Sequence, residues 1–393
     1  MRAGRPLGVA VIGYAFMGKA HSQAWRTVAS HFEVPDFERT VLVGRDAEQV
    51  AGAAQRYGWA ESATDWREVI ARPDIDVVDI CTPGWTHAEI AIAALEAGKH
   101  VLVEKPLSNT LQESEAMVAA AAAARQRGVV SMIGFNYRRV PALAQARKLI
   151  RDGRLGNIRQ IRASYLQDWL SDPEAAMSWR LRKETAGSGA LGDIASHAID
   201  QIRHLTGLDV ADVSARLKTF VPERPGPGGP EAVTVDDAAW LTLGLRGEAA
   251  GDGGAIASVE VSRVALGRKN SLRIEVYGSA GALAFDLERL NELEFLDGTD
   301  PVEEQGFRRI LVTEPEHPYL SAWWPQGHVI GWEHSFTHQI RDFLVAVDEG
   351  TQPSPSFEEG LGVQAILDAA ERSAASGGAV VVPASVPTKQ QEA

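Results

Sequence analysis

Short apolar runs alternate with segments of helical periodicity along the first third of the chain. Each run is too short for a helix and is bounded by glycine, proline or polar residues, as buried strands are. The segments between the runs carry apolar residues at three- and four-residue intervals, which is typical of amphipathic helices. The predicted strands cover residues 7–12, 40–44, 75–81, 100–103 and 129–134. Because strands that alternate with helices form a parallel sheet, we expect a doubly wound α/β domain over residues 1–134.

The pattern changes after residue 134. Helical periodicity over residues 141–152 gives way to a long strand pattern over residues 158–168, and another helix is predicted over residues 193–206. The strand-like runs that follow cover residues 211–221, 238–245, 255–264, 272–277, 283–285 and 293–296. Strands without intervening helices form antiparallel or mixed sheets. Residues 135–393 are therefore predicted to form a second, α+β domain with a large, open-faced mixed or antiparallel sheet.

The end of the chain returns to helical periodicity. Residues 333–348 and 357–375 are predicted helices, and a short strand follows over residues 379–382. These two helices are candidates for packing back on the first domain. Residues 222–230 are rich in proline and glycine, which predicts a loop or a flexible insertion.

Length and composition fit two ordinary globular domains. The chain has 393 residues, more than a single core usually supports, with 45% apolar and 23% charged residues. A formal net charge of −13 repels phosphate backbones, which argues against general nucleic-acid binding. No apolar run has the length of a membrane span, and the first residues lead into a strand rather than a cleavage site, so neither a membrane partner nor an export signal is expected. With Cys81 as the only cysteine, no intrachain disulfide can form, and a cytoplasmic location is expected.

The first predicted strand runs into the motif Gly13-Tyr14-Ala15-Phe16-Met17-Gly18, and a helix follows. Strand, glycine-rich turn and helix in this order form the first half of a dinucleotide-binding unit. Gly13 permits the tight turn, and Gly18 lets helix and strand pack closely. The middle position must be small for a pyrophosphate to approach, and Ala15 narrows that approach. The arrangement predicts a Rossmann domain that binds NAD(P).

The end of the second strand is where such domains read the adenosine ribose, and here it carries Gly44-Arg45-Asp46. An acidic residue at this point binds the 2′-hydroxyl of NAD, whereas an arginine accommodates the 2′-phosphate of NADP. Gly44 and Arg45 therefore favour NADP over NAD. Asp46 argues in the other direction, and Arg45 has the alternatives of stacking on adenine or reaching solvent.

Polar residues also follow two later strands of the first domain. Thr82, Pro83 and His87 come after the strand over residues 75–81, and Lys105-Pro106 comes after the strand over residues 100–103. The carboxyl ends of parallel strands are where ligands bind in such sheets. A lysine at a strand end is usually exposed and inert, but beside a nicotinamide pocket it can hold a substrate hydroxyl and favour loss of its proton.

The predicted helix over residues 193–206 places Asp193 and His197 four residues apart, on one helical face. An imidazole oriented by a carboxylate suits proton transfer near neutral pH. On its own, such a pair is more often a solvated helix face or a capping arrangement. Glycines at positions 187, 189 and 192 are expected to let backbone and substrate approach closely at the start of this helix.

Two other classes of function fit parts of the sequence. His197, Asp200 and His204 share helical spacing, and His334 with His338 forms a second such pair, so a zinc hydrolase is conceivable. The motif His-Glu-x-x-His is absent, and we assign no metal site. The second alternative is a non-enzymatic sensor that binds NAD(P)H and a partner.

Three motifs in order resemble the glucose-fructose oxidoreductase, inositol dehydrogenase and MocA (Gfo/Idh/MocA) family. They are Gly13-x-Ala15-x-x-Gly18, Glu104-Lys105-Pro106 and Gly192-Asp193-x-x-x-His197. The likeness extends from Leu7 to about Val382. More locally, three segments look like the branch that contains levoglucosan dehydrogenase: Phe135-Asn136-Tyr137-Arg138-Arg139, Tyr165-Leu166-Gln167-Asp168-Trp169 and Ser178-Trp179-Arg180.

The resemblance implies an oxidoreductase that transfers a hydride between a ring hydroxyl of a sugar, anhydrosugar or cyclitol and NAD(P). It implies that His197 is the general base, that Asp193 orients it and that Lys105 polarises the hydroxyl. Tyr137 and Gln167 match sugar-contacting positions, and Trp169 and Trp179 offer flat faces for a sugar ring. The matched cofactor positions are Gly13, Phe16, Met17, Gly18, Thr82, Pro83, His87, Glu104 and Pro106.

Two departures from the family pattern stand out. Gly84 replaces a frequent asparagine after Thr82-Pro83, and Gly44-Arg45 replaces the acidic residue that reads NAD in many relatives. The open sheet predicted for the second domain would leave edges unprotected, which suggests self-association as a homodimer or homotetramer.

Overall fold

The structure, a computed structural model, describes residues 5–383, which form two compact units. The first unit holds the residues up to Asn136 together with Trp332–Leu361, and the second holds Tyr137–Gly331 and the residues from Gly362 onward. The sequence-based division placed every residue after 134 in one domain. In the structure, residues 332–361 lie in the first unit instead.

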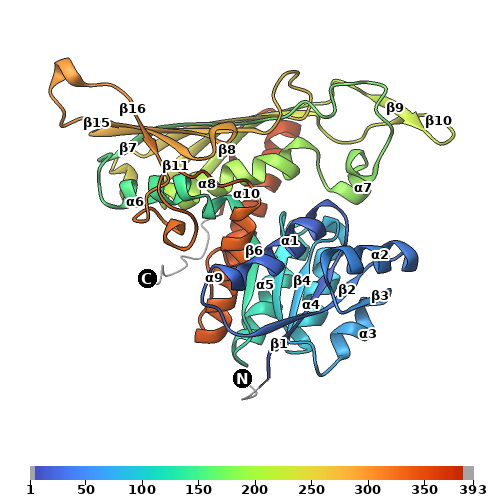
Figure 1. Cartoon of the computed structure of the whole chain (residues 1–393). Helices are drawn as coiled ribbons and strands as arrows, with labels where there is room; N and C mark the ends of the chain where they lie inside the picture. The colour runs from blue at the N-terminus through green and yellow to red at the C-terminus, as the bar shows by residue number, and fades with distance from the viewer. Residues whose placement is uncertain (1–4, 384–393) are drawn as a thin grey trace. The chain divides into compact units, whose positions relative to one another are not determined.

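The first unit is built on a parallel sheet of six strands in the order β3-β2-β1-β4-β5-β6 (Figure 1). This order is that of a dinucleotide-binding fold, with the topological switch between β1 and β4. The strands are β1 (Leu7–Ile12), β2 (Phe37–Val43), β3 (Glu61–Ala63), β4 (Val77–Ile80), β5 (His100–Glu104) and β6 (Ser131–Gly134). The helices are α1 (Phe16–Thr27), α2 (Ala47–Tyr57), α3 (Trp66–Ala71), α4 (His87–Glu96), α5 (Leu111–Arg125) and α9 (His334–Glu349).

Local signals in the sequence account for several helix boundaries in this unit. Thr110 and Glu113 form a capping box at the start of α5, as their spacing suggests. Asp46 and Asp65 cap α2 and α3 through their carboxylates. Helix α9 packs on α1, and its apolar face joins the core around Trp25. The apolar face of α9 is therefore buried against α1, a helix that is far away in the sequence.

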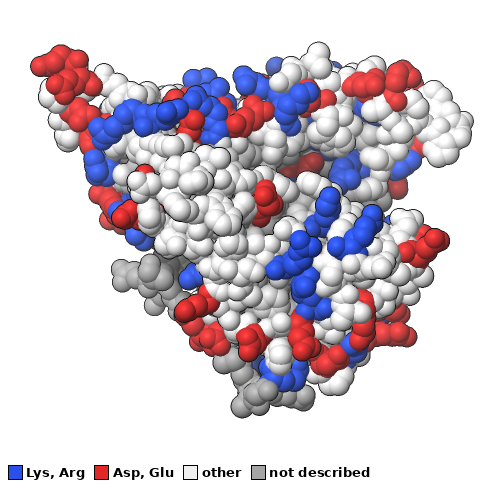
Figure 2. Space-filling view, in the orientation of Figure 1, with Lys and Arg blue, Asp and Glu red and all other residues white. Residues whose placement is uncertain are grey.

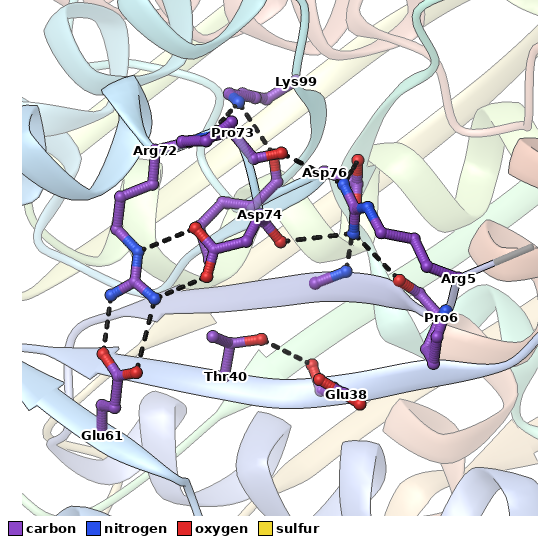
Figure 3. A network of polar contacts seen from close by, with 12 residues as sticks. Arg5, Pro6, Glu38, Thr40, Glu61, Arg72, Pro73, Asp74, Asp76 and Lys99 are labelled. Atoms are coloured by element: carbon purple, nitrogen blue, oxygen red, sulfur yellow. Dashed lines mark hydrogen bonds and ion pairs between the residues drawn. The ribbon is translucent and has the colours of Figure 1, made fainter. Parts of the chain in front are cut away.

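Charged residues tie the amino ends of the parallel strands together (Figure 3). Arg5, just before β1, donates to both carboxylate oxygens of Asp76 at 2.7 and 2.8 Å. Arg72 pairs with Asp74 and with Glu61 of β3, at 2.6 Å in each case. Ligands bind at the opposite, carboxyl ends of such strands. We therefore assign this network to holding the sheet together.

The second unit contains a sheet of nine strands in the order β16-β15-β14-β13-β7-β12-β11-β8-β17. Its strands pair antiparallel except for β7 with β12, which are parallel. The strands are β7 (Ile158–Leu166), β8 (Asp209–Lys218), β11 (Ala238–Arg246), β12 (Ala255–Ser262), β13 (Ser271–Gly278), β14 (Gly281–Asp286), β15 (Glu292–Asp297), β16 (Arg308–Leu311) and β17 (Val380–Val381). A parallel sheet followed by a mixed one confirms the predicted fold class.

One face of this sheet is covered and the other is open. Helices α6 (Pro141–Arg151) and α8 (Ser196–Thr206) lie against it, and the chain also forms α7 (Lys183–Ala186) and α10 (Phe357–Ser376) (Figure 1). The outer face carries Arg162, Arg216, Trp240, Glu260 and Arg273. Figure 2 shows Lys and Arg side chains over this sheet with acidic side chains beside them. Over residues 5–383, none of the helices combines the length and the hydropathy needed to cross a bilayer.

The prediction of a loop or flexible insertion over residues 222–230 is wrong. The segment forms most of an antiparallel hairpin of β9 (Glu223–Gly226) and β10 (Gly229–Ala232). Pro225 faces Pro230 across the ladder, so the two residues that lack an N–H share one position. The buried Arg224 anchors the hairpin by donating to the carbonyls of Leu170 and Asp172 at 2.7 Å.

Candidate active site

The glycine-rich turn after β1 is shaped by close backbone contacts. Gly13 has a φ of 110°, and a Cβ there would lie 2.8 Å from the carbonyl oxygen of Cys81. A Cβ on Gly18 would lie 1.9 Å from the carbonyl oxygen of Gly13. Ala15 is the N-cap residue of α1 and makes no side-chain cap. The backbone N–H groups of the first turn are therefore left for an anion, as dinucleotide pyrophosphates require.

The next two cofactor positions predicted from the motif line the start of α1. Phe16 is 64% exposed and stacks on Trp332 at a centroid distance of 5.6 Å. Met17 is partly buried and packs against the core of the same unit. The exposed ring of Phe16, held at the helix N-terminus by the partly buried Trp332, is a suitable surface for an aromatic ligand.

The end of β2 shows how the ribose-reading residues are used. A Cβ on Gly44 would lie 2.1 Å from the ring of Tyr14, so a side chain at this position is excluded unless that ring moves. Asp46 accepts hydrogen bonds from the backbone N–H of Gln49 at 2.9 Å and from its side-chain amide at 3.0 Å. Arg45 is exposed. The carboxylate of Asp46 thus serves as a helix cap, and both Asp46 and Arg45 are exposed to solvent.

His87 links the two loops that leave β4 and β5. Its Nδ1 lies 2.9 Å from the carbonyl oxygen of Pro106, and its Nε2 lies 2.8 Å from that of Thr82. Burial lowers the pKa of His87 below its ordinary value, which favours the neutral ring. The Lys105–Pro106 peptide bond is cis. Gly84, the departure from the family pattern, sits where a Cβ would come within 2.5 Å of the side-chain oxygen of Asn109.

A buried histidine that the sequence analysis missed lies directly behind Glu104. Nε2 of His21 is 2.9 Å from Glu104, and Nδ1 is 2.9 Å from Asp79. Trp25 donates to the same aspartate at 2.7 Å. Burial is the largest single effect and opposes the charged form of His21, but the charges of Asp79 and Cys81 and their hydrogen bonds together outweigh it, and the pKa of His21 is raised well above its ordinary value. Its signal in the sequence is a polar residue on the apolar face of α1, next to Trp25.

This arrangement also bears on metal binding. In the part of the chain that the structure describes, His21, Asp79 and Cys81 form the one group with metal-ligand spacing. Both nitrogens of His21 already face carboxylates, and burial raises the pKa of the Cys81 thiol. Asp200, of the zinc alternative, is paired with Arg138 at 2.9 and 3.0 Å. The candidate metal ligands are thus engaged in hydrogen bonds and ion pairs with other side chains of the protein.

In the second unit, Asp193 and His197 do not share one regular helix. Leu191–Ala195 form a π-helical turn, and α8 begins at Ser196. The predicted helix over residues 193–206 is therefore wrong at its start. Such π turns are frequent at functional sites. Asp193 lies within ion-pair distance of Arg263, at 3.8 Å.

Two tyrosines enclose the imidazole of His197. Its ring centroid lies 4.6 Å from that of Tyr137 and 5.9 Å from that of Tyr165. The two phenol oxygens are 2.9 Å apart. Burial raises the pKa of Tyr165 well above its ordinary value, so the phenol remains a neutral donor.

Polar side chains continue this cluster toward Trp169. Asn270 accepts a hydrogen bond from Tyr165 at 2.7 Å and from Gln167 at 2.8 Å. Gln167 in turn accepts from the indole N–H of Trp169 at 3.0 Å. The structure thus brings Tyr137, Gln167 and Trp169 together with His197. Asn270 was missed, because it lies just before β13 and no local motif connects it to these residues.

The second predicted tryptophan has a different setting. Trp179 is half-buried, and the guanidinium of Arg180 lies over its ring at 4.3 Å. Burial lowers the pKa of Arg180, and Asp193 opposes that shift. Arg180 and Arg263 are therefore both cations in the surroundings of Asp193.

Comparisons with known proteins show the family to which the chain belongs. Residues 7–135 match the oxidoreductase family with an NAD-binding Rossmann fold, and residues 143–284 match the Gfo/Idh/MocA C-terminal domain. The chain is 43% identical to levoglucosan dehydrogenase of Pseudarthrobacter phenanthrenivorans, over 96% of this chain and 98% of that protein. The chain belongs to the Gfo/Idh/MocA family. The predicted resemblance is thereby confirmed.

Solved structures of Gfo/Idh/MocA proteins extend this similarity to the fold. An oxidoreductase domain protein from Kribbella flavida superposes with a TM-score of 0.94 at 55% identity, over 97% of this chain and all of that one. Levoglucosan dehydrogenase in complex with NADH and levoglucosan superposes with a TM-score of 0.91 at 43% identity, over 96% of this chain and all of that one. The chain is thus an oxidoreductase with an NAD-binding domain, which sets aside the sensor and the zinc hydrolase.

Proposed function

We propose that this oxidoreductase oxidises a ring hydroxyl of a sugar, anhydrosugar or cyclitol, with levoglucosan as the first substrate to test. The observation that carries the proposal is the enclosure of His197 by Tyr137 and Tyr165, with the amides of Gln167 and Asn270 beside them. Neutral hydroxyl and amide groups around a base suit a polyhydroxylated, uncharged ligand. The 43% identity to a levoglucosan dehydrogenase supports the same substrate class.

In the proposed reaction, each residue has a separate task. His197 accepts the proton of the reacting hydroxyl, Asp193 orients the imidazole, and the ammonium of Lys105 polarises the hydroxyl oxygen. Tyr137, Gln167 and Trp169 hold the sugar ring, and Trp179 offers a further flat face. When bound at the glycine-rich turn, the nicotinamide cofactor supplies the hydride acceptor.

For the cofactor, the proposal extends to a preference for NADP. Arg45 is exposed at the end of β2, while both oxygens of Asp46 accept hydrogen bonds from Gln49. An exposed arginine whose acidic neighbour is engaged in capping α2 suits a 2′-phosphate. The solved levoglucosan dehydrogenase complexes contain NADH, so the wild-type ratio of kcat/KM for NADP to that for NAD decides the point. A ratio below one would show that the preference is wrong.

We also propose that the protein is a cytoplasmic homodimer or homotetramer. The outer face of the second unit's sheet carries both signs of charge, with Arg162, Arg216 and Arg273 near Glu260 and Trp240. A surface with both charges can complement a second copy of itself. Light scattering of the purified protein at several concentrations measures the assembly.

The function is tested with a panel of levoglucosan, glucose, L-sorbose and myo-inositol, assayed with NAD and NADP separately. We expect the highest kcat/KM for levoglucosan. His197→Ala is expected to lower kcat by roughly 10²- to 10⁴-fold, because the general base is lost. His328→Ala is the matched control, since this histidine is exposed and its Nδ1 donates to the carbonyl oxygen of Pro325 in its own turn at 2.8 Å. Near-normal kcat for H197A on the best substrate would contradict the assignment of the base.

A further inference from the structure

Arg263 is a buried arginine placed at the start of the proposed catalytic pair. It follows β12 and is 1% exposed. Nη1 lies 3.8 Å from Oδ2 of Asp193, and Nη2 donates to the backbone carbonyl of Asp236 at 3.1 Å. The guanidinium also lies 5.8 Å from the ring centroid of Trp169. A buried charge lowers stability unless it is paired. The position of the guanidinium near Asp193 therefore indicates that this carboxylate is its charge partner.

Asp236 holds the other side of the same turn. Its two carboxylate oxygens accept the backbone N–H groups of Gly189 and Leu191, each at 2.8 Å. Its carbonyl oxygen accepts the N–H of Ala190 at 3.1 Å, in addition to the bond from Arg263. Burial raises the pKa of Asp236, although the two N–H groups oppose this shift. Asp236 therefore binds three successive N–H groups, of residues 189–191, at the start of the π-helical turn that carries Asp193.

The backbones at residues 189 and 236 are in close contact. A Cβ on Gly189 would lie 1.8 Å from the carbonyl oxygen of Asp236. The glycine at position 189 thus allows two backbone segments to approach; the close approach of a substrate, which was also expected here, stays a prediction. The N–H of Arg263 donates to the carbonyl of Asp237 at 2.9 Å, which fixes the arginine to the same strand end.

We propose that Arg263 and Asp236 are positioning residues that hold the Asp193 carboxylate in the orientation in which it serves His197. The inference rests on the proposed function. Asp236 fixes the backbone of the turn, and Arg263 fixes the side chain of Asp193 by charge. Neither residue has to touch the substrate. The arrangement gives the Asp193 carboxylate, the partly exposed side chain of an otherwise buried π-helical turn, a defined position: the buried guanidinium of Arg263 sets it.

The test compares Arg263→Met, Arg263→Lys and Asp236→Asn in the full-length protein, with levoglucosan and both cofactors. Arg224→Met is the matched control, because Arg224 is equally buried and donates to two backbone carbonyls of the same unit, away from Asp193. We expect R263M to lower kcat by roughly 10- to 100-fold, because misplaced catalytic groups have costs of that size. The KM for levoglucosan should change less than kcat. R263K, which keeps the charge, should recover part of kcat.

The pH profile separates positioning from a structural role. The charged or titratable groups whose charge acts on Asp193 include Arg263, Arg180 and Tyr165, and His197 follows one turn later. Removing one cation should move the acid limb of kcat/KM upward by about one pH unit in R263M, since an aspartate beside an arginine stays ionised to lower pH. R224M should lower the melting temperature without moving this limb.

Two results overturn the proposal in distinguishable ways. If R263M, or R263K should the methionine variant not fold, keeps wild-type kcat and an unchanged acid limb while Asp193→Asn is inactive, the positioning role is wrong and the proposed function stands. If D193N and H197A both keep wild-type kcat, the proposed function itself is wrong. A double-mutant cycle adds a third test. If Arg263 acts through Asp193, R263M should lower kcat only slightly when it is introduced into D193N.

Discussion

Replacing His21 with leucine removes the imidazole that two buried carboxylates share. Nδ1 of His21 lies 2.9 Å from Asp79, and Nε2 lies 2.9 Å from Glu104. The side chains of His21 and Asp79 are fully buried, and that of Glu104 is 5% exposed. The leucine variant leaves both carboxylates in an apolar core without this partner.

The expected loss follows from the burial of the pair. Breaking a buried ion pair by removing one partner costs about 3–5 kcal/mol, because the remaining charge is uncompensated. For a unit of this size, 1 kcal/mol corresponds to about 2–4 °C in melting temperature. We therefore expect His21→Leu to lower the melting temperature of the first unit by about 6–20 °C. The melting temperature of His21→Gln should lie between those of wild type and H21L, because glutamine can donate a hydrogen bond but carries no charge.

The pH dependence of this loss has a definite sign. The pKa of His21 in the folded protein is raised well above the unfolded value of 6.5. Its contribution to stability is therefore complete below pH 6.5 and disappears as the pH rises through the folded-state pKa. The difference in melting temperature between wild type and H21L should be largest near pH 6 and shrink toward pH 9.

Differential scanning fluorimetry and urea unfolding from pH 4 to pH 9 measure this difference. His100→Leu is the control with opposite sign, since burial lowers the pKa of His100 to about 4 and its stabilising contribution is lost as the pH falls from 6.5. If H21L melts within 2 °C of wild type at pH 6, or if the difference grows as the pH rises, the assignment of a charged His21 is refuted.

Three further changes test other parts of the structure. Thr110→Ala removes the capping box of α5 and should cost about 1 kcal/mol, measured by urea unfolding. Gly189→Ala should abolish activity and lower the melting temperature, whereas Gly253→Ala, where a Cβ meets nothing within 4 Å, should leave both unchanged. Tyr165→Phe removes hydrogen bonds of 2.9 and 2.7 Å and should raise the KM for levoglucosan roughly tenfold with a smaller effect on kcat; an unchanged KM would place the substrate elsewhere.

Periodicity was sufficient for the main elements of the fold, because those elements bury continuous apolar faces. Strand β1 begins and ends at the predicted residues, and α9 covers residues 334–349 where the pattern indicated 333–348. Short edge strands were missed, among them β3 (Glu61–Ala63) and β16 (Arg308–Leu311). Strand β3 has three residues and β16 has four, and each pairs on one side only, so neither has an apolar run or alternation long enough to detect.

The residues of the candidate site also fall into those that a local motif predicts and those that depend on the folded structure. Gly13 and Gly18 were predicted because a local turn requires them, and the structure gives the same physical reason. Asn270 and Arg263 were not predicted, because each depends on which strand ends lie side by side. Strand β7 pairs with β13 on one side and with β12 on the other. This pairing places Gln167 near Asn270, and no feature of either local sequence indicates it.

In the stretch from Gly187 to His204, the structure pairs the carboxylates with other residues than the helical spacing suggested. Regular i,i+4 spacing suggested that Asp193 pairs with His197 on one helix, yet the turn around Asp193 is π-helical and its ion-pair partner, Arg263, lies just after β12. Asp200, one turn after His197, pairs with Arg138 near α6. Carboxylates on one short segment therefore serve different partners on different elements. Because Asp193 lies within the π turn that precedes α8, it does not share the regular helical spacing that relates His197 to Asp200, and its carboxylate lies near Arg263 at the end of β12.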